Sequence, residues 1–186
     1  MIWTSHLSPD VGRHVSRLLR VSVVDQGMLG FGRLDDDVSI AKYVRQLAIK
    51  LQPDEAWLFY GQEHGCPVFM LFIERFPHPT SRHLAEVSKA IIDPKWRGRG
   101  IVKRVLRELI TKAREVGIGA FVLDVREGTR AAQLWQLLGF RVYGRLDDYA
   151  RYDNHSYSGL YMAATITDLD QRSRITRTTA PVSSVY

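Results

Sequence analysis

The sequence predicts a mixed α/β domain in which strands alternate with amphipathic helices. Its clearest element is a helix from Gly100 to Val116, where apolar residues recur at steps of three and four positions. Apolar strands are predicted on either side of this helix, at His83–Ile92 and Ala120–Val125. A strand–helix–strand unit of this kind requires the two strands to be parallel, with a right-handed crossover.

The segments before this unit predict two helices and three strands. A short strand is expected at Met1–Thr4. Two apolar runs further along flank a loop of hairpin composition at Gly61–Pro67. The expected helices are Pro9–Gln26 and Val38–Leu51, and the expected hairpin strands are Trp57–Tyr60 and Val68–Ile73.

The segments after the unit predict a short helix and a closing pair of strands. Arg130–Leu138 should be helical and end at Gly139, and Phe140–Leu146 should pair antiparallel with Tyr157–Ala164. From residue 165 onward apolar residues become scarce while Thr, Ser and Arg dominate. We therefore expect a folded domain over residues 1–164 and a poorly ordered tail over residues 165–186.

The composition is that of an ordinary globular domain: 186 residues, 45% apolar and 25% charged. No apolar run approaches the roughly 20 residues of a membrane span, and the N-terminus lacks a signal-peptide pattern. Cys66 is the only cysteine, so an internal disulfide is excluded and the cytoplasm is the expected location. Since no second His/Cys pair accompanies His64 and Cys66 at ligand spacing, we expect no metal.

A basic turn with two glycines precedes the central helix. The first N–H groups of a helix lack intrahelical partners and the helix dipole adds positive charge, so a helix start attracts anions. The glycines leave room for a phosphate, and three cations add charge. These residues are Gly98, Gly100, Lys95, Arg97 and Arg99. The turn predicts a pyrophosphate site; the alternative is a plain surface turn before a solvated helix. The dinucleotide and ATP-loop patterns do not fit.

This turn resembles the acyl-CoA motif R/Q-x-x-G-x-G/A of the GCN5-related N-acetyltransferases, the GNAT family. Here it reads Arg97-Gly98-Arg99-Gly100-Ile101-Val102, with Val102 in place of the final Gly or Ala. Gly128–Phe140 is similar to the family segment ending A-x-x-x-Y-x-x-L-G-F. Further segments resemble the branch that includes tabtoxin resistance protein: Gly27–Phe31, His83–Lys89, Leu123-Asp124 with Gly128, and Asp148–Ala150.

The resemblance implies the GNAT fold: a mixed seven-stranded sheet, splayed between its fourth and fifth strands and flanked by about four helices. Acetyl-CoA would be the cofactor, with its pantetheine arm in the splay and an amide near Ile91 or Ile92 stabilising the oxyanion. The loop with Phe31 and Asp35 would receive the acceptor, although Asp35–Asp37 could instead cap the next helix. The implied cofactor contacts are Ala90, Ile91, Ile92, Arg97, Gly98, Arg99, Gly100, Ile101, Val102, Gly128, Ala131 and Trp135.

Acetylation of an amine needs a base, because an amine with a pKa near 10.4 is almost wholly protonated at neutral pH. By resemblance, Glu86 and Asp124 are the candidate bases and substrate contacts, at matching heights on neighbouring strands. The alternatives are an ion pair of Glu86 with Lys89 or Arg82, and turn capping by Asp124. Strand alternation would place on the face of Glu86 the residues Leu84, Ser88, Ala90 and Ile92.

The family's usual tyrosine acid is replaced here by Trp135, and an indole N–H cannot usefully give up its proton. Tyr143 or Tyr149 could protonate the departing thiolate instead, or water could assist, or the protein could be a weak catalyst. The alternative for Trp135 is a large core residue.

The expected function is acetyl-CoA-dependent N-acetylation of a small amine, an amino-acid-like or antibiotic-like molecule whose modification would confer antibiotic resistance. The alternatives are acetylation of a protein lysine or N-terminus, and a CoA-binding protein that has lost catalysis. The net charge of +6 permits nucleic-acid binding, but the clustered charge better suits a phosphate-rich cofactor. We expect neither nucleic acid nor membrane as a partner. A homodimer is compatible with the sequence, which identifies neither the acceptor nor the oligomeric state.

Overall fold

The computed structural model describes residues 1–24, 36–152 and 154–178, and these contain one sheet of seven strands. The strands are β1 (Ile2–Thr4), β2 (Ala56–Glu63), β3 (Cys66–Arg75), β4 (Leu84–Ile92), β5 (Ala120–Arg126), β6 (Arg141–Tyr152) and β7 (His155–Thr165). Their order is β1-β2-β3-β4-β5-β7-β6, and only the β4–β5 pair is parallel. The predicted mixed α/β class and the parallel strand–helix–strand unit are confirmed.

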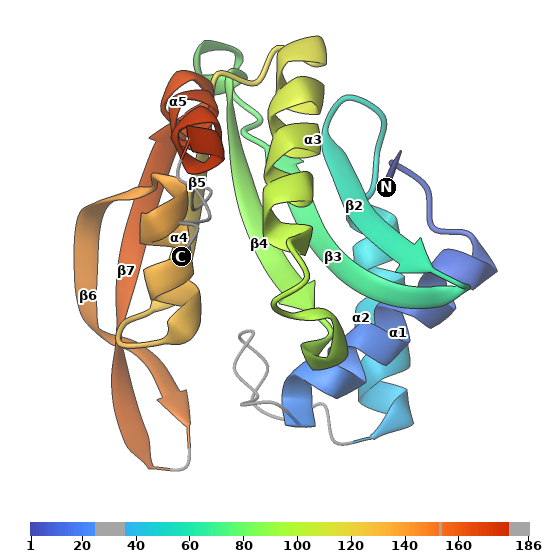
Figure 1. Cartoon of the computed structure of the whole chain (residues 1–186). Helices are drawn as coiled ribbons and strands as arrows, with labels where there is room; N and C mark the ends of the chain where they lie inside the picture. Colours follow the sequence, from blue (N-terminus) through green and yellow to red (C-terminus); the bar gives the residue numbers. More distant parts are fainter. Residues whose placement is uncertain (25–35, 153, 179–186) are drawn as a thin grey trace, which may run out of the picture.

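In the described residues, five α-helices cover the two faces of this sheet, one more than the resemblance implied (Figure 1). They are α1 (Pro9–Val24), α2 (Asp37–Lys50), α3 (Ile101–Glu115), α4 (Arg130–Leu138) and α5 (Ile166–Thr178). Helices α1 and α2 pack on one face, in a core cluster that includes Leu58 and Phe72. Helices α3, α4 and α5 pack on the other face, with Phe59 and Phe69. None of the described helices is long and apolar enough to cross a membrane.

The parallel strands β4 and β5 stay together over a short distance only. Their pairing consists of Leu84 with Ala120, Ala85 with Phe121 and Glu86 with Val122. Beyond Glu86, β4 continues to Ile92 and β5 to Arg126 without pairing to each other, and the ribbons separate (Figure 1). The splay expected between the fourth and fifth strands is confirmed.

A β-bulge interrupts β4 at Lys89, whose φ of 52° lies in the left-handed region. On the β3 side, Phe72 pairs with Ser88 and Met70 with Ile91, so β4 carries one extra residue here. Side chains after the bulge therefore change face: Ile91 joins the core beneath α1 and α2. The expected alternation holds through Ser88 but is wrong for Ala90 and Ile92, because a bulge shifts the two-residue period.

The C-terminal segment forms a packed helix where an irregular tail was expected. Helix α5 covers Ile166–Thr178, and its Leu169 side chain is fully buried in the core beneath α3. Asp170 receives a hydrogen bond from Arg114 of α3 at 2.8 Å. The tail prediction is therefore wrong over this range, because two buried apolar residues and an ion pair suffice to dock a helix on an existing core. Residues 179–186 lie outside the described residues.

The closing hairpin is longer than predicted, since β6 runs to Tyr152 and β7 begins at His155. Its outer part projects beyond the rest of the sheet (Figure 1). Polar contacts hold this part together; for example, Arg151 Nε lies 2.9 Å from an oxygen of Asp148. The apolar alternation that predicts strands is absent there, which explains why the prediction stopped at Leu146.

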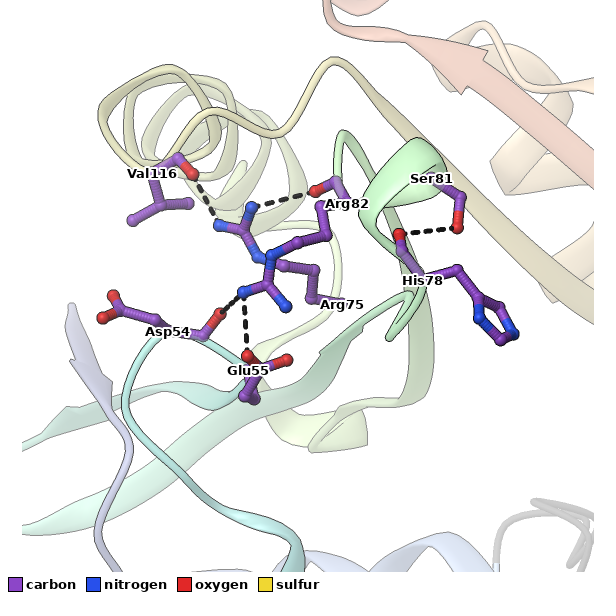
Figure 2. Close-up of polar contacts among 7 residues, drawn as sticks. All are labelled: Asp54, Glu55, Arg75, His78, Ser81, Arg82 and Val116. Carbon is purple, nitrogen blue, oxygen red and sulfur yellow. Dashed lines mark hydrogen bonds and ion pairs between the residues drawn. The ribbon is translucent and has the colours of Figure 1, made fainter.

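Arg75, the last residue of β3, clamps the C-terminal end of α3 (Figure 2). Its guanidinium donates to the Val116 carbonyl at 2.5 Å and to the Arg82 carbonyl at 2.8 Å. It also stacks over Trp57, 5.5 Å from the ring centre. Because the last carbonyls of a helix carry partial negative charge, a cation is favourable there. The clamp fixes one end of α3 over the sheet and so helps to position its other end beside the splay.

Replacing Arg75 by Met should lower the free energy of unfolding by about 2–3 kcal/mol, because two carbonyls lose a charged donor. Chemical denaturation measures this change. The matched control is Arg82→Gln, which removes a partly exposed ion pair with Glu55 and a contact with the Asp54 carbonyl but keeps the Arg82 carbonyl. That substitution should lower the free energy of unfolding by less than about 1 kcal/mol. Equal losses in both variants would contradict the clamp.

Candidate active site

A cavity of about 1000 Å³ lies where β4 and β5 separate. Its walls come from the ends of these strands, the start of α3, one side of α4, and α5. Ser22 of α1 also lines it, so the cavity reaches through the splay to the opposite face of the sheet. The predicted cofactor residues that line it are Ala90, Ile91, Ile92, Arg97, Gly98, Gly100, Ile101, Val102 and Ala131.

The turn between β4 and α3 is held by the buried carboxylate of Asp93, which is 3% exposed. Asp93 accepts a hydrogen bond from the Lys95 amide at 2.9 Å and its carbonyl accepts one from Trp96 at 2.8 Å. These bonds close a short 3₁₀ turn, Pro94–Trp96, directly before the glycines. The sequence analysis did not single out Asp93, although an Asp directly before a Pro is a recognisable turn signal.

Gly98 and Gly100 both adopt left-handed conformations, with φ values of 75° and 71°. A Cβ on either residue would meet no atom within 4 Å, so open space lies in front of this backbone. Gly100 is the N-cap of α3 and supplies no side-chain cap. The first N–H groups of α3 therefore face an open site with no capping oxygen from the N-cap, which is the arrangement that binds an anion.

The described lining residues carry six basic side chains and no acidic one. The positive residues come from the turn, from α3, from the end of β5, from the start of α4 and from α5: Arg97, Lys103, Arg107, Arg126, Arg130 and Arg172. Apolar side chains, among them Leu106 and Leu134, form much of the remaining wall. Such a cavity suits a ligand that combines several negative charges with an apolar body.

Three of the expected cofactor contacts do not line the cavity. Arg99 stacks over Trp96, 4.7 Å from the ring centre, and Gly128 lies in the turn before α4. Trp135 packs edge-on against Phe140 with ring centres 5.0 Å apart, and both belong with the core beneath α3. The core interpretation of Trp135 is therefore the one that the packing supports.

The two predicted carboxylates lie on the face of the sheet that the cavity reaches through the splay. Glu86 pairs with Val122, so Asp124 lies two residues further along β5, about 7 Å on. The prediction that Glu86 and Asp124 lie at matching heights is therefore wrong by two residues. Burial raises the pKa of Glu86, and the negative charges of Asp124 and Glu74 raise it further. Its proton affinity is thus shifted toward the range of a useful general base.

Tyr149 of β6 reaches Asp124 by crossing β7. Its hydroxyl donates a hydrogen bond to an Asp124 carboxylate oxygen. The ring lies over Gly159, where a Cβ would overlap it, and edge-on to Tyr161 at 6.4 Å. Burial, followed by the hydrogen bond to Asp124, raises the pKa of Tyr149. The tyrosine therefore stays protonated and orients the carboxylate.

Lys89 is a further charged group at this site, and the sequence analysis gave it no functional role. Burial lowers its pKa, while the charges of Asp124 and Glu86 act in the opposite direction. The positive charge of Lys50 also acts on Lys89, and Lys50 itself binds Glu74, with 2.9 Å between the paired atoms. The bulge brings Lys89 into this group of charged side chains, and the periodicity of the sequence does not predict the bulge.

The remaining candidates lie outside the site or outside the described residues. Tyr143 is 64% exposed, near Tyr161 at 6.3 Å, and is not a cavity residue. Phe31 and Asp35 lie outside the described residues. Asp36 caps α2 by accepting from the Ser39 amide at 2.7 Å, as the capping alternative predicts. Within the described part of the chain, no group of three or more His, Cys, Asp or Glu side chains could hold a metal ion.

A family model described as the acetyltransferase (GNAT) family matches residues 29–140 of this chain. Comparison with curated protein sequences gives no match.

Solved structures share the fold at low sequence identity. A ribosomal-protein-alanine N-acetyltransferase from Brucella melitensis is 21% identical, with a TM-score of 0.67 over 89% of this chain and 99% of that one. The structure of yncA from Salmonella typhimurium with its cofactor acetyl-CoA is 16% identical, with a TM-score of 0.68 over 89% and 94%. A proposed phosphinothricin N-acetyltransferase is 16% identical, with a TM-score of 0.69 over 88% and 97%.

Glu86→Gln should stabilise the protein at pH 8 relative to wild type but not at pH 4. Because the pKa of Glu86 is raised in the folded state, wild type loses stability as the pH rises from the unfolded pKa, near 4.3, through the folded one. Glutamine does not titrate and avoids this loss. Melting temperatures of both proteins across this pH range test the prediction, and a pH-independent difference would contradict it.

Proposed function

The chain belongs to the acetyltransferase (GNAT) family, and we propose that it transfers an acetyl group from acetyl-CoA to the amine of a small molecule. The observation that supports this most is the cavity in the splay, which lies beside the open helix start at Gly100 and reaches through to the face of the sheet on which Glu86 and Asp124 lie. The family uses acetyl-CoA, and the described residues fit it. Open space in front of Gly98 and Gly100 admits a diphosphate, and all six charged side chains of the described lining are basic.

In this proposal the turn from Arg97 to Val102 holds the diphosphate through the first N–H groups of α3 and the Arg97 guanidinium. Ala90, Ile91 and Ile92 lie along the unpaired edge of β4, where backbone groups can hydrogen-bond an extended pantetheine arm. Ala131 of α4 contacts the cofactor from the opposite wall. Trp135, on the same helix, packs against Phe140 in the core, whereas Arg99 stacks on Trp96 beside the glycine turn.

When bound, acetyl-CoA supplies an acyl group activated as a thioester; the chain's own residues supply the proton transfers. Glu86 removes a proton from the acceptor ammonium, directly or through water, because its raised pKa makes it a stronger base than an exposed glutamate. Asp124, oriented by Tyr149, binds the ammonium and shares this work. An amide of Ile91 or Ile92 at the splay edge donates to the acyl oxygen as it gains negative charge.

The acceptor proposed is a small zwitterionic amine of the amino-acid or antibiotic type. Glu86 and Asp124 attract its cationic amine, and Lys89 beside them suits an acidic group on the same molecule. Activity on such a compound would make antibiotic resistance the biological role. The single cysteine supports a cytoplasmic location.

A second candidate is a CoA-binding protein with weakened catalysis. Its supporting observation is that no tyrosine lines the cavity in the described residues and that Trp135 occupies the position of the usual acid. Release of free thiol from acetyl-CoA, measured with a panel of amines, separates the two candidates. Turnover with any amine supports the enzyme; binding of acetyl-CoA without turnover supports the silent binder.

Gly100→Glu should abolish acetyl-CoA binding. The carboxylate would repel the diphosphate, and the left-handed φ of 71° disfavours a side chain. Acetyl-CoA at about 100 times its dissociation constant should stabilise wild type by about 2.7 kcal/mol, which a thermal shift measures, and should leave the variant unchanged. The matched control is Gly65→Glu, also a left-handed glycine but in the β2–β3 turn. Retained binding by the Gly100 variant would refute the assigned turn.

Glu86→Gln and Asp124→Asn should each lower kcat by roughly 100-fold or more, the usual contribution of a general base, without weakening acetyl-CoA binding. Steady-state thiol release and isothermal titration measure the two quantities. Glu115→Gln, at the remote end of α3 in an exposed pair with Lys112, serves as the control. Unchanged kcat in both site variants would remove these residues as bases.

A further inference from the structure

We infer that Arg145 is a positioning residue of the proposed active site, because it holds a bulge of β6 that brings Tyr149 to Asp124. This inference rests on the proposed function, in which Asp124 binds the acceptor ammonium and shares the removal of its proton. It extends the site from the pair of carboxylates to the hairpin of β6 and β7.

The bulge gives β6 two more residues than the facing stretch of β7. Leu146 pairs with Gly159 and Ala150 pairs with Tyr157, so three residues of β6 lie opposite a single residue of β7. A bulge re-aims the side chains of the strand that carries it. Tyr149 is the last of these three residues, and its side chain crosses β7 to reach the carboxylate on β5.

The ring of Tyr149 keeps this course because position 159 is a glycine. A lone hydrogen bond between partly exposed groups is worth little, since water competes for both partners. A Cβ on Gly159 would lie 2.2 Å from Cγ of the tyrosine ring, which is too close for any side chain. The ring therefore rests directly on the backbone of β7, edge-on to Tyr161 with 6.4 Å between the ring centres.

Three nitrogens of Arg145 hold the first residue of the bulge and its surroundings. Nε donates to Glu127 at 2.8 Å, one terminal nitrogen binds Asp147, and the other donates to the Ser158 hydroxyl at 2.9 Å. The Ser158 hydroxyl in turn donates to the Asp147 carbonyl at 3.3 Å. Glu127 directly follows β5, so one planar guanidinium ties the bulge both to β7 and to the end of β5.

These contacts direct the bulge more than they stabilise the fold. The side chains of Arg145 and Glu127 are 49% and 41% exposed, and ion pairs at such positions contribute little to stability. The pairing of β6 with β7 continues on both sides of the bulge without them. Loss of Arg145 should therefore release Tyr149 from Asp124 while the sheet stays folded.

The first test needs no substrate and follows the ionisation of Tyr149 through the absorbance of tyrosinate. Burial and the hydrogen bond to Asp124 raise the pKa of Tyr149, as do the charges of Asp124, Tyr161 and Glu86. Arg145→Gln should return this pKa towards its ordinary value near 10, so the variant should contain about one tyrosinate more than wild type at about pH 11. The same substitution in a Tyr149→Phe background should add none.

The second test measures thiol release from acetyl-CoA with the common L-amino acids as probe amines. Arg145→Gln, Gly159→Ala and Tyr149→Phe should each lower kcat/KM for the most active amine about tenfold, the effect of one lost hydrogen bond to a charged group. The KM for acetyl-CoA should stay unchanged. Because Arg145 acts through Tyr149, the double variant Arg145→Gln/Tyr149→Phe should be no worse than Tyr149→Phe alone.

Two control variants match these substitutions in chemistry and in location. Arg141→Gln removes an exposed arginine of the same strand, which lies 3.4 Å from Asp168. Gly144→Ala adds a Cβ to a glycine of the same hairpin, at an ordinary contact distance of 3.7 Å from Tyr161. Both should equal wild type in tyrosinate content and in turnover. Melting temperatures of all the variants report whether the hairpin remains paired.

An unchanged tyrosinate content in Arg145→Gln would overturn the inference. So would additive losses in the double variant, or an equal rise of KM for acetyl-CoA and for the amine. In each of these cases wild type still transfers the acetyl group, so the proposed function stands. Absence of thiol release by wild type with any amine would instead overturn the proposed transfer, and the tyrosinate measurement would still decide whether Arg145 positions Tyr149.

Discussion

The parting of β4 and β5 after three residue pairs is the constraint on which the rest of this structure depends. Buried backbone N–H and C=O groups require partners, so two strand edges that diverge inside a domain are stable only if something fills the space between them. The bulge at Lys89 turns the end of β4, while β7 holds β5 along its full length. The protein thereby keeps two hydrogen-bonding edges open to a ligand.

The open splay separates charge of opposite sign on the two faces of the sheet. On the side of α3, α4 and α5 the described lining is basic, which suits a ligand with several phosphates. On the side of α1 and α2 lie Glu86 and Asp124, two residues apart in the register of β4 and β5, and burial together with the charge of Asp124 raises the pKa of Glu86. An anionic donor and a cationic acceptor would therefore approach from opposite faces and meet between the strands.

Local patterns in the sequence were sufficient to predict α3, the glycine turn and the parallel strand–helix–strand unit, because each depends on residues close together in the chain. Features that depend on tertiary contacts could not be predicted in this way. Helix α5 docks through Leu169 and Asp170 on a surface that exists only after folding. The bulge at Lys89 interrupts the two-residue alternation of side chains along β4, on which the strand prediction depends. The hydrogen bond from Tyr149 to Asp124 needs β6, β7 and β5 to be aligned, with a glycine at position 159 beneath the ring.

Under the proposed function, the placement of Tyr149 indicates which proton transfer the site assists. An acceptor amine has a pKa near 10.4, about three pH units above neutrality, whereas a thiol has a pKa near 8.5 and is already partly ionised there. Removing the amine proton is thus the harder of the two steps. Tyr149 is committed to Asp124, and its raised pKa makes it a poor acid. Trp135 is packed in the core and takes no part in proton transfer. The described polar groups therefore assist removal of the amine proton, and water can protonate the departing thiolate.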